Sequence, residues 1–353
     1  MTVERPPPPP PSRPPTIYDV AKAAGVAAST VSRAFSRPGR VNAETAERIR
    51  AAAQALGYRT NPLARALPTG RTSMIAVIIS DITNPFYFEI IRGAQAAAAE
   101  AGYTMLLADA QESDVLEREA LDRALPTVEG IVLASSRMSD SAIRMTAKQR
   151  PMIVLNRAVA GVPSLVTDNP HGARRAAEHF ADLGHRTITY VAGPEASWAD
   201  GIRWRSLREA AADLGLQTRR LGPYKPNVAG GEQAAGDLVH KPTTAILAYN
   251  DQLAIGIIRG LTAVGTVVPD DVSIIGFDNI FAADLITPRL TTVAAPLRAL
   301  GGTAVHNLLA IINGARSRAS DPTVLPTRLV ERASTTRRSR RRAMTPTGRT
   351  SAN

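Results

Sequence analysis

From residue 74 onward, short apolar runs alternate with segments of helical periodicity, and this alternation restricts the fold more than any other feature. Strands that alternate with helices predict parallel sheets covered by helices. About 260 residues exceed one ordinary doubly wound sheet, so we predict two Rossmann-like α/β subdomains. The predicted strands are 74–79, 104–108, 130–134, 152–155, 187–192, 245–248 and 272–276, and the predicted helices are 86–101, 116–125, 173–183, 203–214, 251–263 and 300–313.

Residues 16–57 carry dense helix signals and no strand signal. Thr16 and Asp19 have the spacing of a capping box, and Gly25 is a helix stop. Three short helices are predicted, at 17–24, 28–36 and 43–56, which is enough for a small bundle. Their buried faces are expected to carry Val31, Phe35, Ala46, Ile49, Ala53 and Leu56.

The net charge of +11 is concentrated at the two ends of the chain. Residues 1–71 carry 11 basic and 4 acidic side chains, and residues 332–353 carry 7 basic and none acidic, whereas the middle is slightly acidic. Cationic ends on a neutral body predict contact with an anionic polymer or surface, such as nucleic acid. For the basic tail, 335–353, a solvated disordered segment and a nonspecific DNA contact both stay open. The six prolines at 6–11 predict a disordered leader over 1–15.

Composition excludes several classes of protein. The sequence has no Cys, so disulfides, thiolate metal sites and Cys nucleophiles are excluded. An apolar run of roughly 18 residues, which a membrane span needs, is absent, and so is a secretory signal at the start, which predicts the cytoplasm. The five His lack metal-ligand spacing, and no phosphate-binding Gly-rich motif or nucleophile elbow is present. We therefore predict no catalytic residue, no metal and no cofactor.

The first two helices, joined by a turn at 25–27, have helix-turn-helix spacing, in which the second helix fits the DNA major groove. Arg33 can pair with a guanine edge, while Tyr18 and Arg40 are placed for backbone phosphates. A plain helical hairpin is the alternative, and the local charge favours DNA. The residues expected to be exposed on the second helix are Ala28, Ser29, Ser32, Arg33 and Ser36.

Ligands of parallel α/β sheets bind beyond the carboxyl ends of the strands, where loops and helix N-termini converge. The residues found there are rich in amides, carboxylates and aromatic rings, which suit vicinal hydroxyls and the C–H face of a sugar. Such residues are also common turn formers and helix caps, and we interpret Asn169 and Asp251 mainly as caps. The candidates are Asn84, Phe86, Asn156, Asp168, Asn169, Asn250, Asp251 and Asp278.

Several motifs together resemble the lactose-repressor (LacI/GalR) family of bacterial transcription regulators. They are Thr16 to Val26, then Ser29-Thr30-Val31-Ser32-Arg33, then Gly57 to Arg65, and the similarity continues to about Ser334. The resemblance implies DNA contacts that include Thr30, Asn61 and Arg65, and a hinge helix whose Leu67 enters the minor groove. This segment is barely two turns long, so it needs help to form, although leucines packed between domains are an alternative. Ala27 departs from the family, which usually has Ser there, and this removes an N-cap hydroxyl.

The resemblance also sharpens the cleft prediction. By motif position, the residues that match the family's effector contacts are Phe86, Tyr87, Asn156, Arg203, Asn250 and Asp278. Arg205 competes with Arg203 for the register of the ligand arginine, and Tyr224 is a further candidate for the cleft wall. The implied core is similar to periplasmic binding proteins.

The predicted organisation is a leader (1–15), a helix-turn-helix domain (16–60), a hinge (61–71), an effector-binding and dimerisation core (72–334) and a basic tail (335–353). We predict a cytoplasmic, nucleoid-associated homodimeric repressor that binds a near-palindromic operator in double-stranded DNA under the control of a small carbohydrate-like effector, with no membrane partner. The alternatives are a solute-binding protein without a transcriptional role and a carbohydrate-processing enzyme fused to a DNA-binding domain.

Overall fold

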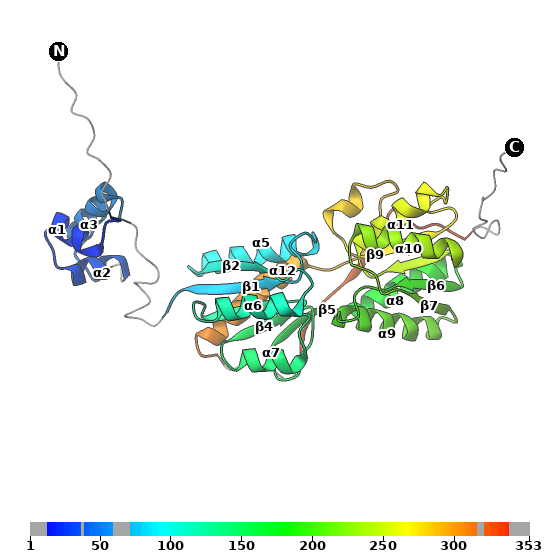
Figure 1. Cartoon of the computed structure of the whole chain (residues 1–353), viewed down its shortest axis with the longest axis horizontal. Helices are drawn as coiled ribbons and strands as arrows, with labels where there is room; N and C mark the ends of the chain where they lie inside the picture. The colour runs from blue at the N-terminus through cyan, green and yellow to red at the C-terminus, as the bar shows by residue number, and fades with distance from the viewer. Residues whose placement is uncertain (1–12, 37–38, 59–70, 316–320, 339–353) are drawn as a thin grey trace, which may run out of the picture. The chain divides into compact units, whose positions relative to one another are not determined.

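The computed structural model describes residues 13–36, 39–58, 71–315 and 321–338 (Figure 1). The chain divides into two units, Met1–Ser73 and Met74–Asn353, and each is described by itself. The division falls after Ser73, whereas the sequence analysis ended the linker at Arg71. The predicted leader up to residue 12, nearly all of the predicted hinge and the tail after Arg338 lie outside the described residues.

The first unit is a bundle of three helices: α1 (Ile17–Ala24), α2 (Ala28–Ser36) and α3 (Ala43–Leu56). All three have the predicted bounds. Gly25, with φ of +61°, ends α1 in the left-handed conformation that glycine adopts without steric cost. The predicted apolar stripe of α3 is wrong at its end, because Leu56 is exposed in the last turn while Ile49 and Ala53 are buried. The small core consists of Val20, Ala21, Ala24, Val31, Ile49 and Ala53.

The second unit contains two six-stranded sheets, as the α/β alternation predicts. The first sheet has the order β11-β5-β4-β3-β1-β2 and the second the order β12-β10-β9-β8-β6-β7. Every pairing is parallel except that of β10 with β12. The strands of the first sheet are β1 (Met74–Ile79), β2 (Thr104–Asp109), β3 (Gly130–Ala134), β4 (Met152–Leu155), β5 (Ser164–Thr167) and β11 (Thr323–Leu325). Those of the second are β6 (Thr187–Val191), β7 (Gln217–Leu221), β8 (Ala245–Ala248), β9 (Ser273–Asp278), β10 (Thr291–Ala294) and β12 (Arg328–Val330).

Helices cover both faces of each sheet. Around the first sheet lie α5 (Phe86–Glu100), α6 (Asp114–Ala124), α7 (Asp140–Ala147) and α12 (Leu297–Ile312), and around the second lie α8 (Asn169–Asp182), α9 (Trp198–Asp213), α10 (Val228–His240) and α11 (Asp251–Ala263), with a short 3₁₀ turn η1 (Phe281–Asp284) (Figure 1). Successive residues of β1 point to opposite faces of the sheet. Val77 packs in the apolar cluster that includes α5 and α12, and Ile78 packs in the cluster that includes α6 and α7. Over the described ranges, no helix is long and apolar enough to cross a membrane.

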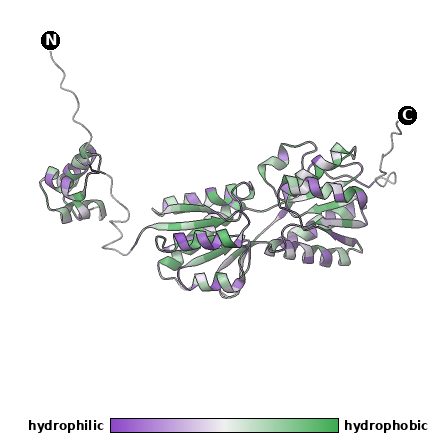
Figure 2. Ribbon diagram, in the orientation of Figure 1, coloured by the Kyte–Doolittle hydropathy of each residue, from purple (hydrophilic) through white to green (hydrophobic). Residues whose placement is uncertain are grey.

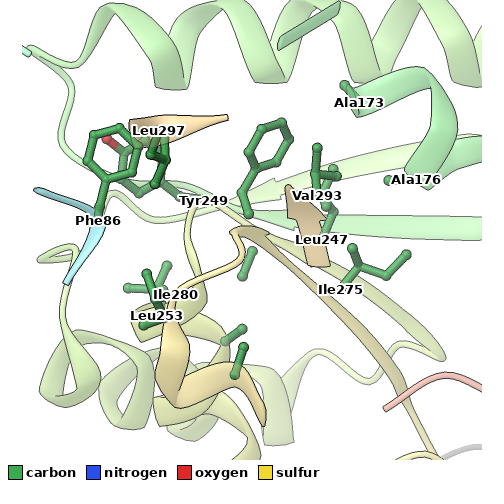
Figure 3. Close-up of a cluster of buried hydrophobic side chains, with 14 of the residues drawn as sticks. Phe86, Ala173, Ala176, Leu247, Tyr249, Leu253, Ile275, Ile280, Val293 and Leu297 are labelled. Atoms are coloured by element: carbon green, nitrogen blue, oxygen red, sulfur yellow. The ribbon is translucent and has the colours of Figure 1, made fainter. Parts of the chain in front are cut away.

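The chain passes between the two sheets three times. It goes from β5 into α8, returns from β10 into α12, and passes again from β11 to β12. The largest apolar cluster contains side chains of both subdomains, and Figure 3 shows part of it, including Phe86 from the first and Tyr249 from the second. Hydropathy follows the layers, since the strands are mostly hydrophobic and the helices carry hydrophilic side chains (Figure 2). Three connecting segments therefore join the two subdomains.

The predicted strands all form, with ends within two residues of the prediction. Five strands have no predicted range: β5, β7, β10, β11 and β12. These strands are short or polar: β7 lies at a sheet edge and carries exposed Arg219 and Arg220, so it lacks the apolar run used to find strands. Helices α7 and α10 were not predicted either, and the predicted start of α9 at Arg203 is wrong. Ser197 caps this helix by accepting a hydrogen bond from the backbone N of Asp200 at 3.3 Å.

The described structure extends four residues beyond the predicted end of the core at Ser334. Ser334 is fully buried, and its hydroxyl donates to the carbonyl of Ile274 at 2.6 Å. The backbone N of Thr336 donates to Ser273 Oγ at 3.0 Å, and that of Arg338 to the carbonyl of Leu183 at 2.8 Å. The prediction of a disordered tail from residue 335 is therefore wrong for Thr335 to Arg338, because these residues satisfy polar groups at the edge of the second subdomain.

Helices α5 and α12 approach closely at two glycines. A Cβ on Gly301 would overlap the carbonyl oxygen of Ile90, and a Cβ on Gly93 would overlap that of Arg298. Gly302, next in the chain, has room, because a Cβ there would lie 3.6 Å from the nearest atom, the carbonyl oxygen of Gly93. The two helix backbones therefore touch at Gly93 and Gly301.

We expect Gly301→Ala to lower the free energy of unfolding by about 1 to 3 kcal/mol, because the added methyl group must push α5 away from α12. Gly302→Ala is the matched control, and it is expected to stabilise the helix by up to about 1 kcal/mol. Urea denaturation followed by circular dichroism measures both. Equal effects of the two substitutions would show that the helices do not pack as described.

Candidate functional site: a helix-turn-helix unit and an inter-subdomain cleft

The N-terminus of α1 is fixed by a side chain from its own first turn. The Asp19 carboxylate accepts hydrogen bonds from the backbone N of Thr16 at 2.8 Å and from its hydroxyl at 2.7 Å. These bonds lower the pKa of Asp19 below its ordinary value. Helix α2 lacks a side-chain cap at Ala27, and its first turn is closed by the backbone N of Thr30, which donates to the carbonyl of Ala27 at 2.9 Å. Helix α2 therefore forms although Ala27 lacks the hydroxyl that the resembled family usually has at this position.

The exposed surface of the first unit differs in part from the prediction. Tyr18 is 73% exposed, and Ser29, Arg33 and Arg40 are exposed as expected. The prediction that Ala28 is exposed is wrong, because it packs against the small core, and Thr30 and Ser32 are half-buried. Arg33 Nη2 donates to Ser29 Oγ at 3.4 Å, a weak bond that leaves the guanidinium available. The remaining DNA-contact candidates, Asn61, Arg65 and Leu67, and the side chain of Ser36 lie outside the described residues.

In the second unit, the six predicted effector residues lie at or just beyond the carboxyl ends of strands or on the helices that follow. All six are at most 7% exposed, and they come from both subdomains. Phe86 and Tyr87 begin α5 and contact each other edge to face, with ring centroids 5.0 Å apart. Burial raises the pKa of the Tyr87 hydroxyl above its ordinary value. The predicted aromatic pair is thus part of the core.

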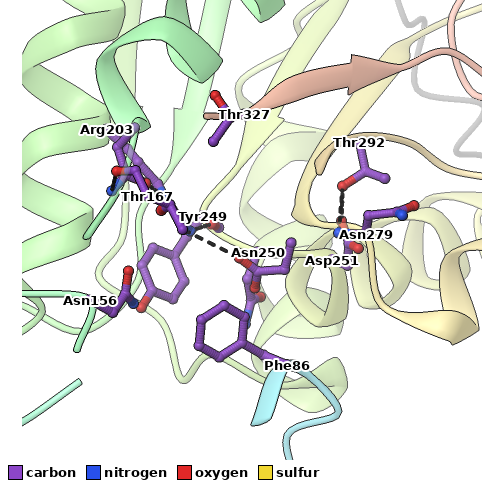
Figure 4. Close-up of polar contacts among 12 residues, drawn as sticks. Phe86, Asn156, Thr167, Arg203, Tyr249, Asn250, Asp251, Asn279, Thr292 and Thr327 are labelled. Carbon is purple, nitrogen blue, oxygen red and sulfur yellow. Dashed lines mark hydrogen bonds and ion pairs between the residues drawn. The ribbon is translucent and has the colours of Figure 1, made fainter. Parts of the chain in front are cut away.

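Arg203 is the most heavily bound of these residues (Figure 4). Its Nε donates to Asn169 Oδ1 at 2.8 Å, its Nη1 to the carbonyl of Tyr249 at 2.5 Å, and its Nη2 forms a 3.2 Å ion pair with Asp278. Its Cζ lies 3.8 Å from the ring centroid of Phe277, so the guanidinium is stacked as well as hydrogen-bonded. Arg205, the competing register, is exposed.

Two buried carboxylates share this region. Burial raises the pKa of Asp278 to about 6, although Arg203 lowers it in part. Burial and the neighbouring Asp278 raise the pKa of Asp251 well above its ordinary value. Asp278 also has φ of +108°, which is strained for a residue with a Cβ. An ionisable group held in a strained conformation at a cleft is typical of a ligand-binding site.

The helix caps are distributed differently from the prediction. Asp168, not Asn169, caps α8 by accepting from the backbone N of His171 at 2.9 Å, and Asn169 binds Arg203 instead. Asn250, not Asp251, caps α11 by accepting from the backbone N of Leu253 at 2.9 Å. Both interpretations as caps were therefore wrong by one residue. An Asx pair at a helix start offers two possible caps, and the sequence does not choose between them.

Asp251 instead connects β10 to the loop after β9. It accepts from the hydroxyl of Thr292 at 2.5 Å and from the backbone N of Ile280 at 2.8 Å. Asn250 Nδ2 donates to the carbonyl of Pro226 at 3.0 Å, so both polar atoms of Asn250 bind backbone. Asn156 donates through Nδ2 to Ser135 Oγ at 3.1 Å, while its buried Oδ1 has no hydrogen-bond partner among the described residues. An acceptor of this kind can accept a hydrogen bond from a ligand hydroxyl.

A pocket of about 620 Å³ opens between loops of both subdomains. Arg137 and Glu112 belong to the first subdomain, and Glu195, Tyr224 and Lys225 to the second. Tyr224 thus lines the cleft as expected. Neither Arg137 nor Glu112 is among the predicted site residues. Both follow predicted strands by a few residues, so the preference of ligands for the carboxyl ends of parallel strands could have identified them. Tyr249, which directly follows β8 and precedes Asn250, is not among the predicted site residues either.

A second groove, of about 720 Å³, runs along α5 and α12 and is bordered by Asp278 and Ala295. Asp278 is therefore the one predicted effector residue that borders this groove, among the residues that the structure describes. Polar and charged groups from the two subdomains meet at both openings, an arrangement suited to holding a small polar molecule.

Comparison with known proteins agrees with this architecture. Residues 16–61 match the bacterial regulatory proteins of the lacI family, and residues 177–335 match a periplasmic binding protein-like domain. The HTH-type transcriptional regulator DegA of Bacillus subtilis is 34% identical over 330 residues, which cover 91% of this chain and 98% of DegA. The chain belongs to the LacI family. It is a transcriptional regulator with the family's helix-turn-helix and periplasmic-binding-protein-like parts, as the motifs predicted.

Solved structures give the same result. The lac repressor dimer bound to operator and an anti-inducer has a TM-score of 0.82 with 27% identity, covering 92% of this chain and all of the repressor chain. A LacI family regulator from Enterococcus faecium with bound ribose has a TM-score of 0.68 with 32% identity, covering 75% of this chain and all of that one. Both the two-sheet core and the helical unit of this LacI-family chain therefore have solved counterparts.

We expect Arg203→Gln to cost about 3 to 5 kcal/mol of folding free energy, because it leaves the Asp278 carboxylate buried without its cation. The loss is expected to grow with pH. A carboxyl whose folded pKa exceeds its unfolded value of about 3.9 destabilises the fold as pH rises through that interval. Removal of Arg203 raises the folded pKa further, so the variant continues to lose stability above about pH 6.

Urea denaturation at several values between about pH 5 and pH 8 measures this difference. Arg174→Gln is the matched control, since Arg174 makes a half-exposed ion pair with Asp213 on the same subdomain and is expected to contribute less than about 1 kcal/mol. Parallel pH profiles for Arg203→Gln and the wild type would contradict the role of Arg203 as the partner of Asp278.

Proposed function

We propose that this LacI-family regulator is a homodimeric repressor whose affinity for operator DNA is set by a small polyhydroxylated molecule bound between its two sheets. The observation that carries the proposal is the presence, on one chain, of a helix-turn-helix unit and a two-sheet body with a polar pocket at its junction. The relatives support it, because the lac repressor was solved as a dimer on operator and the Enterococcus faecium regulator with ribose.

The DNA contacts are assigned to the first unit. The charge of residues 1–71, with 11 basic against 4 acidic side chains, favours binding to phosphates. Exposed Arg33 on α2 supplies a fork of donors that fits O6 and N7 of guanine, and Tyr18 and Arg40 are available for phosphates. Two copies related by a two-fold axis require a near-palindromic operator. We propose that the segment 61–71 serves as the hinge and that Leu67 enters the minor groove.

Effector binding is coupled to DNA binding through the three crossings between the sheets. A ligand that holds the two subdomains at one angle changes how the two hinges of a dimer are spaced, and thereby whether both helical units can reach the operator. Coupling of this kind is reciprocal, so operator and effector change each other's affinity by the same factor. Asn156 Oδ1 and the polar groups of the 620 Å³ pocket supply acceptors and donors for hydroxyl groups.

Binding, rather than catalysis, is the activity we propose. In the described part of the chain, no group of three His, Asp or Glu side chains could hold a metal ion. A solute-binding protein without a transcriptional role would not need the helix-turn-helix unit, so we favour the regulator. We propose the cytoplasm, at the nucleoid, as its place of action because operator DNA lies there.

The function is tested by selecting fragments of the host genome on the purified chain at physiological salt, and by measuring their affinity with fluorescence anisotropy. We expect one or a few near-palindromic fragments to bind at least about a thousandfold more tightly than random DNA. A ribose- and cellobiose-containing saccharide panel is then added. The expected result is a changed operator affinity and an equal reciprocal change in saccharide affinity. The same affinity for every fragment, with and without the panel, would exclude the proposed function.

Arg33→Ala is expected to weaken operator binding by about 1 to 3 kcal/mol and to relax the preference at one base pair, because it removes a two-donor contact to a base. Arg50→Ala is the matched control, since Arg50 is exposed on α3 and paired with Glu47 at 2.7 Å. Anisotropy titrations with the selected operator and single-base variants measure both. A uniform loss over all base variants would instead assign Arg33 to a phosphate.

A further inference from the structure

The second sheet has a further pocket, of about 350 Å³, at the amino ends of its strands. Of the residues that line it, Thr187 begins β6, Gln217 begins β7, and Thr244 directly precedes β8. Asn250 and Asp278, by contrast, mark the carboxyl ends of β8 and β9, where the effector residues were predicted. The pocket therefore lies at the opposite end of the strands from the effector residues. Its volume is at the lower end of the range for small-molecule sites.

The last described residues of the chain form one wall of this pocket. The backbone N of Thr336 donates to Ser273 Oγ at 3.0 Å, where β9 begins, and the backbone N of Arg338 donates to the carbonyl of Leu183 at 2.8 Å. Two hydrogen bonds to different segments thus fix the backbone around Arg338. The Arg338 side chain lines the pocket.

The buried ring of His185 joins this C-terminal segment to the pocket. A carbonyl can only accept a hydrogen bond, so His185 Nε2 donates to the carbonyl of Thr336 at 3.3 Å, and Nδ1 accepts from the hydroxyl of Thr244 at 3.0 Å. Burial lowers the pKa of His185, the hydrogen bond with Thr336 raises it in part, and the Arg338 guanidinium lowers it. The ring is therefore uncharged at neutral pH, and the Arg338 charge acts on this end of the sheet.

The second cation of the pocket is Arg219, on the edge strand β7. Its Nη2 donates to the carbonyl of Pro242 at 2.8 Å and to Thr189 Oγ1 at 3.3 Å, so one side of the guanidinium is held by the sheet. Its Nη1 and Nε, the Arg338 guanidinium and the Gln217 amide have no hydrogen-bond partner within the described ranges. These groups leave several donors available to a ligand.

The charge of the pocket has one sign. Among the described residues that line it, Arg219 and Arg338 are cationic and none is a carboxylate. Two guanidinium groups without a counter-charge create a positive potential, which attracts an anion. Arginine is also the side chain whose fork of donors best matches the oxygens of a phosphate group.

We propose that this pocket binds a dianionic phosphate group, either free phosphate or the phosphate of a small monoester. The two charges of Arg219 and Arg338 balance those of such a group, whereas a carboxylate or a phosphodiester carries one charge and leaves one guanidinium uncompensated. A bound phosphate connects the C-terminal segment, through Arg338, to the edge strand β7, through Arg219. The effector cleft and the proposed function do not depend on this site.

Isothermal titration calorimetry on the full chain tests the proposal, in chloride buffer near physiological ionic strength. We expect saturable binding of inorganic phosphate or glycerol 3-phosphate with half-saturation at about 1 mM or below. Tighter binding of glycerol 3-phosphate assigns a monoester, and equal affinities assign free phosphate. Dimethyl phosphate, which carries one charge, is expected to bind at least about tenfold more weakly. No saturable binding of either dianion up to about 10 mM would overturn the proposal.

The decisive variant is Arg338→Gln, because the Arg338 side chain makes no contact within the described ranges and its loss should leave the fold intact. We expect it to weaken phosphate binding at least about tenfold, since it removes a charge-assisted contact. Arg219→Gln should do the same, with a thermal melt to confirm folding. Arg205→Gln is the matched control, because it removes one exposed charge from the same subdomain outside the pocket. Equal losses in Arg338→Gln and Arg205→Gln would show general attraction and overturn the site.

Phenylglyoxal, which modifies free guanidinium groups, locates the ligand independently. Peptide masses report the reaction at each arginine, and phosphate is expected to protect Arg338 and Arg219 but not Arg205. Equal protection of all three would overturn the site. So would displacement of phosphate from the pocket by random duplex DNA with a steep salt dependence, because the surface would then belong to nucleic acid.

Discussion

Arg203 cannot be buried unless several other segments supply acceptors at fixed positions. Moving a guanidinium out of water costs several kcal/mol, which is offset only when its donors are paired. Asn169 at the start of α8, the carbonyl of Tyr249 after β8 and Asp278 at the end of β9 provide those partners. The carboxyl ends of the second sheet are consequently locked around one side chain of α9. Movement of these loops relative to one another would break a buried ion pair and two buried hydrogen bonds.

This locking has a consequence for ligand recognition. A side chain whose donors are already satisfied gains little from a new hydroxyl, whereas an unsatisfied acceptor gains a full hydrogen bond. Arg203 is of the first kind and Asn156 Oδ1 of the second. The two subdomains therefore differ at the cleft. In the second, Arg203 holds the loops together, whereas in the first, Asn156 Oδ1 is able to accept a hydrogen bond.

The fold and the family could be predicted from sequence because they depend on patterns that repeat along the chain. The apolar runs of β1, β3, β4 and β8 and the capping sequence of α1 are local, and the structure confirms them. Site details depend on which neighbour occupies a given volume. Asn250 and Asp251 look equivalent as caps, and the choice is made by Thr292, 41 residues away, which binds Asp251. The edge strand β7 was not predicted for a related reason, since it carries arginines that bind neighbouring segments and has no apolar run.

The position of the Tyr249 ring could not be predicted from the sequence for a similar reason. Tyr249 lies between a strand and a helix cap and belongs to no motif. Its ring fits where it does because Gly193 has no Cβ. A glycine after one strand and a tyrosine after another, 56 residues apart, are complementary only once β6 and β8 are paired side by side. Parallel pairing brings the carboxyl ends of distant strands to one edge, and this places the Tyr249 ring against Gly193 and beside Arg203, which motif comparison alone does not predict.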